Sequence, residues 1–97
     1  MDEDVVRSHV QAHGEAMVAG DLRRAGADLT ESGRAGAGTV MAALPKAIES
    51  AELVSLEPAG DCYLARIRYR GEGRQVEVRS RWEERDGRPM ITELGLA

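Results

Sequence analysis

The second half of the chain alternates apolar and polar residues over four short stretches, and this alternation limits the fold more than any other feature. A period of two residues is typical of strands that bury one face of a sheet. The segments between the stretches, EPAGD, GEGR and RDGR, are turn-forming and too short for a crossover, so neighbouring strands should run antiparallel. The pattern predicts four strands, at residues 47–57, 62–70, 75–84 and 88–95.

The first half carries apolar residues at helical spacing instead. Three acidic residues open the first helix, where they interact favourably with the helix dipole, and Gly20 should end it. Asp21 is a suitable cap for a second helix over residues 21–29. The N-terminal half is therefore expected to begin with two consecutive helices.

A third helix is expected over residues 30–44, ended by the proline that follows. Gly36 and Gly38 lie inside it, and each costs about 1 kcal/mol relative to alanine. The expected fold class is α+β, with N-terminal helices packed on one face of a curved four-stranded antiparallel sheet, a β-meander. All 97 residues should form one domain, with 1–45 helical and 46–97 in the sheet.

The turns also predict a strand register. Arg70 should face Gln75 across the glycine loop, and the other two turns should set Arg85 opposite Arg88 and Glu57 opposite Cys62. This register gathers apolar residues on one face, which a slip of one residue would scramble. Two rows of that face would be Leu56, Tyr63, Trp82 and Ile91, then Val54, Ala65, Ser80 and Glu93. The acid Glu52, opposite Ile67, would share the face.

The opposite face of the expected sheet mixes arginine, glutamate and leucine. One interpretation is a solvated surface; the other is a homodimer interface in which arginines surround apolar patches. The interface residues would be Leu53, Leu64, Arg66, Arg79 and Leu94. A nucleic-acid partner is not expected, because the net charge is −4 and the aromatic residues fall on the other face.

Composition excludes several other classes of protein. Hydrophobic residues make up 42% and charged residues 31% of the chain, as in soluble globular proteins. The single cysteine and two histidines give no disulfide and no zinc-site pattern, so neither a metal nor another cofactor is expected. No apolar run reaches the length of a membrane span or a signal peptide. A cytoplasmic protein without a membrane partner is the expectation.

Two stretches carry a resemblance to a known family. They are AHGEAMVAGDLRRAGADL (12–29), with a GD between two helices, and VRSRWEERDGRPMITEL (78–94), with a closing hairpin of the form W-x-x-x-D-G-x-x-x-I. Together they resemble the nuclear transport factor 2-like superfamily, especially its small bacterial SnoaL-like members, which form a cystatin-like α+β cone. The usual early strand pair is missing from this sequence, which implies a shallower cone.

The resemblance implies a set of functions rather than one. The superfamily includes polyketide cyclases, ketosteroid isomerase, dehydratases and many non-catalytic ligand-binding or dimerisation domains, and a fold does not decide among them. Polar pocket residues are few here, so we expect a non-catalytic domain that homodimerises through its sheet and binds a small apolar ligand in the cone. The pocket would be lined by Glu52, Val54, Tyr63, Ala65, Ser80 and Trp82.

The alternative is a SnoaL-like isomerase or cyclase. In the cyclases of this family an acid projects into the cone from a late strand, and Glu93 is the nearest equivalent. His13, on the apolar stripe of the first helix, would serve with it in acid–base proton transfer. The simpler interpretations are that Glu93 lies in water at the cone mouth or pairs with an arginine, and that His13 is a core histidine.

Overall fold

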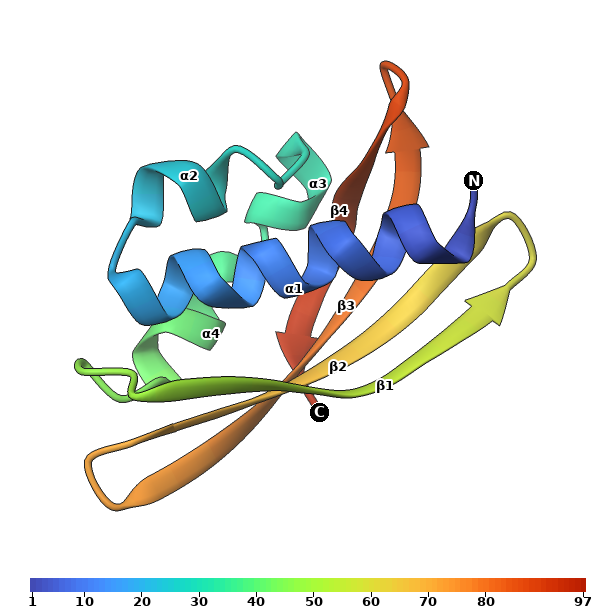
Figure 1. The fold of residues 1–97 in the computed structure, drawn as a ribbon. Coiled ribbons are helices and arrows are strands. Elements are labelled where there is room, and N and C mark those ends of the chain that lie inside the picture. The colour runs from blue at the N-terminus through green and yellow to red at the C-terminus, as the bar shows by residue number, and fades with distance from the viewer.

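The computed structural model describes all 97 residues, and it is α+β as expected (Figure 1). The four strands form one antiparallel sheet in the order β1-β2-β3-β4, and the helices cover one of its faces. None of the helices has the combination of length and apolar character needed to cross a bilayer. In chain order the elements are α1 (Glu3–Ala19), α2 (Leu22–Gly26), α3 (Glu31–Arg34), α4 (Ala37–Ala43), β1 (Ser50–Ala59), β2 (Cys62–Gly71), β3 (Arg74–Arg85) and β4 (Arg88–Leu96).

The first helix ends at Gly20 and the second is capped by Asp21, as the sequence predicts. The side chain of Asp2 accepts a hydrogen bond from the backbone of Asp4, and α1 ends at Gly20, whose φ of 72° lies in the left-handed region that glycine tolerates. The side chain of Asp21 accepts from the backbone of Arg24 at the start of α2. The second helix is shorter than predicted, because a bridge to the sheet follows it.

The predicted third helix is instead two short ones, α3 and α4, which meet around Gly36. This segment lies against the backbone of β4. A Cβ at Gly33 would overlap the carbonyl oxygen of Ile91, and one at Gly36 would overlap that of Leu94. The two glycines therefore allow a close approach to the sheet, and the helix is interrupted where the chain makes that approach.

The central hairpin, β2 with β3, has the predicted register, including Tyr63 opposite Trp82 and Arg70 opposite Gln75. The β1–β2 register was predicted wrongly. Ala59, not Glu57, faces Cys62, because the turn is tighter, with Gly60 in the left-handed region. A β-bulge at Val54 then adds one unpaired residue to β1.

The β3–β4 register begins as predicted and then shifts. Arg85 faces Arg88 and Trp82 faces Ile91, but an irregularity between Arg81 and Trp82 changes the pairs beyond them. Ser80 therefore faces Leu94 instead of Glu93. An extra residue moves the following side chains to the opposite face of a strand, so the two shifts change which residues face the helices.

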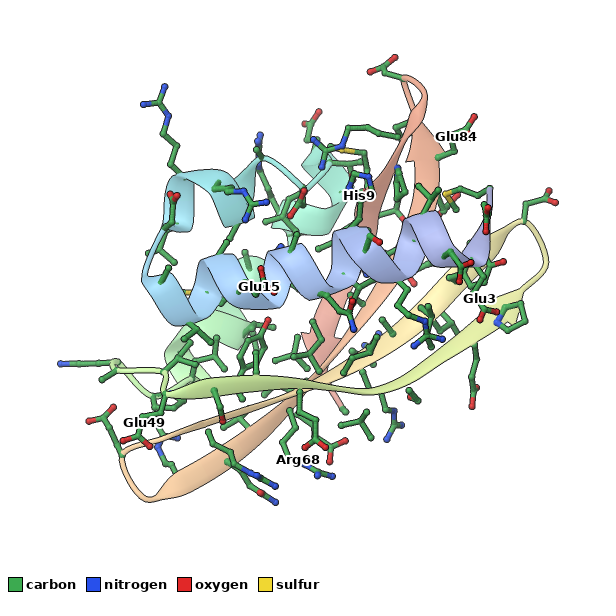
Figure 2. The ribbon with its side chains drawn as sticks, in the orientation of Figure 1. Glu3, His9, Glu15, Glu49, Arg68 and Glu84 are labelled. Atoms are coloured by element: carbon green, nitrogen blue, oxygen red, sulfur yellow. The ribbon has the colours of Figure 1, made fainter.

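Four side chains consequently lie on the face opposite to the one predicted. Glu52 now faces Arg68 and Glu93 faces Arg81, both on the outer face, which Figure 2 shows at Arg68 as the side away from α1. Leu53 and Leu94 pack against the core on the helical face. Two acids are thus removed from the expected apolar face, and two leucines are removed from the expected interface.

The core lies between α1 and the sheet. Val6 and Val10 of α1, Trp82 of β3 and Ile91 of β4 have no exposed surface, and Tyr69 of β2 is almost fully buried. Nε1 of Trp82 donates a hydrogen bond to Oγ of Ser80, 2.9 Å away, so the one indole in the chain is buried with its polar atom satisfied.

Candidate functional site

An apolar cavity of about 190 Å³ lies between the helices and the sheet. Most of its lining residues are hydrophobic and come from α1, α2, α4 and the inner face of the sheet, among them Met17, Ala25, Val40 and Val78. Leu22 and Met41 also line it, yet they are 52% and 44% exposed, which places them at its opening. Two of the lining residues, His13 and Tyr69, have a polar group on an aromatic side chain.

His13 is held in place by contacts on two sides. Its Nδ1 lies 2.9 Å from Oδ2 of Asp28, and its ring packs edge-on against Trp82, with the ring centroids 5.9 Å apart. The side chain is nearly buried. Its other ring nitrogen, Nε2, has no hydrogen-bond partner in the protein.

Asp28 is positioned by the backbone around it. The segment after α2 forms a bridge to the edge of β4, in which Ile91 donates to the carbonyl oxygen of Asp28 and Thr30 donates to that of Ile91. The other carboxylate oxygen of Asp28, Oδ1, accepts a hydrogen bond from Arg88, at the start of β4. One carboxylate thus joins α1, the segment after α2 and the closing hairpin.

The charge state of Asp28 follows from these contacts. Burial of the carboxyl group would by itself raise the pKa of Asp28, but the interactions with His13 and Arg88 outweigh it and hold the pKa below its usual 3.8. The carboxylate is therefore ionised at neutral pH. A neutral imidazole beside it carries its proton on Nδ1, which leaves Nε2 as an acceptor.

Tyr69 contributes the second polar group of the cavity. Its ring is buried in the sheet's inner face, and burial raises the pKa of Tyr69 above its usual 10.0. The hydroxyl therefore stays protonated at neutral pH and can donate a hydrogen bond. No atom of the protein accepts a hydrogen bond from it.

The predicted catalytic pair is not brought together. His13 lies on the helical side of the sheet, whereas Glu93 lies on the outer face, where its side chain is 60% exposed and 3.9 Å from Arg81. The predicted partner of Glu93, Ser80, hydrogen-bonds to Trp82 instead. No group of His, Cys, Asp and Glu side chains is arranged to hold a metal ion.

The predicted pocket residues are also dispersed. Tyr63, Ala65, Ser80 and Trp82 belong to the inner face, but none of them lines the cavity that contains His13. Ala65, Ser80 and the bulged Val54 instead line a separate depression of about 600 Å³, together with residues of the outer face. Glu52 lies on the outer face, in an ion pair 3.4 Å from Arg68.

The outer face keeps three of the five predicted interface residues, Leu64, Arg66 and Arg79. Leu64 is exposed, as is Val54 beside the same depression. Arg66 lies 3.8 Å from Glu77, whereas Arg79 forms no ion pair and its guanidinium lies over Gly95. The face is thus a mixture of paired charges with a small apolar area.

Sequence reasoning missed three important residues: Asp28, Arg88 and Tyr69. Asp28 stands beside Leu29 near the end of the expected second helix, and a carboxylate that becomes buried there needs a partner. Arg88 was considered only as a turn residue. The contact between His13 and Asp28 joins residues 15 apart and depends on how α2 meets β4, so no local pattern pointed to it.

Comparisons of this chain with protein-family models, with curated proteins and with solved structures found no match.

Proposed function

We propose that this protein binds a small, mainly apolar ligand in the cavity between its helices and its sheet. The observation that carries the proposal is the combination of an apolar lining with a histidine held by Asp28. Ligand sites are generally apolar cavities with a few fixed polar groups, and this cavity has that composition. Leu22 and Met41, exposed at its opening, would be covered by a bound ligand.

The volume limits the size of the ligand. Cavities of roughly 150 Å³ with apolar linings accommodate benzene, and this one measures about 190 Å³. A single ring with a small substituent therefore matches it, whereas a polycyclic ligand would require the helices to move. A ligand of this size should bind with a Kd on the order of 0.1–1 mM, or about 4–5.5 kcal/mol.

The resemblance to the nuclear transport factor 2-like superfamily agrees with a ligand on this side of the sheet. Membership in that superfamily is part of the proposal, and it rests on the segments 12–29 and 78–94. The alternative isomerase or cyclase would need His13 and Glu93 in one cavity, and they lie on opposite faces of the sheet. Ligand binding without that catalytic pair is therefore the function that we propose.

We also propose that two copies associate through the outer face of the sheet. Exposed Val54 and Leu64, with Arg66 and Arg79 beside them, support this proposal. With Leu53 and Leu94 on the helical face, the apolar area is smaller than the sequence suggested. Arginine around a small apolar centre remains a common composition for such interfaces.

Toluene is a suitable first probe for the cavity. Its binding can be measured by NMR titration of the amide signals of α1, α2 and α4. Binding should shift these signals and leave those of the outer face unchanged. Ala25→Leu would fill part of the cavity and should weaken toluene binding, whereas Ala42→Leu makes the same change at an exposed position of α4 and should not. Equal weakening of toluene binding by both variants would contradict the proposal, as would the absence of shifts with both toluene and phenol at millimolar concentration.

A further inference from the structure

Two residues that line the cavity, His13 and Tyr69, each carry a polar atom with no hydrogen-bond partner in the protein, and the chemistry of these atoms is complementary. In the neutral imidazole whose Nδ1 donates to Asp28, Nε2 of His13 accepts a hydrogen bond, and the hydroxyl of Tyr69 donates one. Neither atom is sealed off: the fully buried side-chain polar atoms that lack a partner are Nε of Arg68 and Nε of Arg81. Both residues line the same small cavity, so a ligand that fills it meets both.

We propose that the cavity selects a neutral ring compound bearing a hydroxyl group, a ligand of the phenol class, whose hydroxyl donates to Nε2 of His13 and accepts from Tyr69. This inference rests on the proposed ligand-binding function and names the ligand class. Asp28 and Arg88 act as positioning residues, because they hold the imidazole so that its acceptor nitrogen is the one left to the ligand.

Other ligand classes fit these two groups less well. A hydrocarbon satisfies neither of them, and a ketone accepts from Tyr69 but leaves Nε2 of His13 without a donor. A carboxylate would bring its negative charge into an apolar cavity lined by no lysine or arginine, with ionised Asp28 nearby. A hydroxyl, which is both donor and acceptor, is the simple group that matches both partners.

The size of the cavity agrees with this ligand class. A phenol-sized molecule places its ring against apolar side chains such as Met17, Val40 and Leu94, while its hydroxyl occupies the polar part of the lining. An unpaired polar group costs more on burial than a paired one gains, so the fit should appear mainly as discrimination between ligands of equal size.

Phenol and toluene are matched probes, because they share a ring and differ in one polar group. NMR titration of the full chain should give a Kd for phenol about tenfold lower than for toluene, as two net hydrogen bonds would produce. Cyclohexanone, an acceptor only, should bind more weakly than phenol. If neither phenol nor toluene binds, both the inference and the proposed function fail. If the two bind equally, the inference alone fails.

Two variants connect the preference to its residues. Tyr69→Phe removes the donor and keeps the ring, and His13→Asn can still donate to Asp28 in place of Nδ1 while it removes Nε2. In each variant, the ratio of the toluene Kd to the phenol Kd should fall to about threefold or less. The toluene Kd by itself reports any change in the cavity. A preference for phenol that persists unchanged in both variants, or cyclohexanone bound by the wild type as tightly as phenol, would overturn the proposal.

Discussion

Nδ1 of His13 lies 2.9 Å from Oδ2 of Asp28, and this contact joins the middle of α1 to the segment that pairs with the edge of β4. Arg88, in the closing hairpin, donates a hydrogen bond to the same carboxylate. The arrangement therefore serves two purposes: it connects the helical layer to the last strand, and it sets which nitrogen of His13 faces a ligand.

Replacing Asp28 with asparagine should lower the free energy of unfolding by about 1–3 kcal/mol. The variant keeps the shape of the side chain but leaves His13 and Arg88 without their charged partner. Urea denaturation of both proteins measures the loss. Glu3→Gln is the control, because it removes an exposed ion pair with Arg7 that contributes less than about 0.5 kcal/mol. Equal losses in the two variants would contradict a structural role for Asp28.

Acid should remove the contribution of Asp28 in a defined range. The pKa of Asp28 is lower in the folded protein than its usual 3.8. The stabilisation is therefore complete at pH values well above 3.8, and it is lost as the pH falls through the lower pKa of the folded protein. The difference in unfolding free energy between the wild type and Asp28→Asn should therefore shrink as the pH falls from about 5 toward 2.

The comparison with the variant is needed because a second carboxyl group behaves similarly. The hydrogen bond from Thr92 lowers the pKa of Glu83, with Arg85 and Arg81 adding to the effect, so Glu83 also loses stabilising interactions in acid. Glu83 is present in both proteins and cancels in the difference. A difference that stays constant down to pH 2 would contradict the lowered pKa of Asp28.

Gly36→Ala should destabilise the protein by more than about 2 kcal/mol, because the new Cβ would overlap the carbonyl oxygen of Leu94 and force α3 and α4 away from β4. Gly38→Ala is the matched control. It lies within α4 with no atom within 4 Å of the new Cβ, so it should stabilise the protein by up to about 1 kcal/mol. Thermal unfolding of both variants checks the opposite signs.

The outer face should mediate a homodimer at micromolar concentration, burying roughly 1,200–2,000 Å² in total. Arg66→Glu with Arg79→Glu should separate the two copies, since the new charges would lie near Glu77 and Glu93 of the same face. Light scattering measures the mass of each protein.

The control for association is Arg23→Glu with Arg34→Glu, which makes the same change of charge at exposed positions of α2 and α3. This variant should remain dimeric. A wild-type protein of monomer mass would reject the dimer outright, and separation of both variants would indicate an effect of net charge rather than of this face.

Much of the fold could be predicted because its signals are local. Alternation with a period of two residues defined the four strands, and the glycine loop fixed the register of β2 and β3, including Tyr63 opposite Trp82. Asp2, Gly20 and Asp21 marked helix ends through contacts within a few residues of themselves. Such features depend on neighbouring residues, so the sequence alone determined the α+β class and the antiparallel meander.

The tertiary structure decided which side chains meet. The bulge at Val54 and the shift after Arg81 moved Glu52 and Glu93 to the outer face, and Leu53 and Leu94 to the core. Alternation in sequence does not locate such shifts.

The candidate site depends on the same kind of long-range packing. Gly33 and Gly36 let the chain approach β4, the segment after α2 then pairs with that strand, and Asp28 consequently reaches both His13 and Arg88. None of these partners is close to Asp28 in sequence. The sequence therefore determined the layers, whereas contact between the layers decided where the cavity lies and which polar groups face it, because both depend on how distant segments pack.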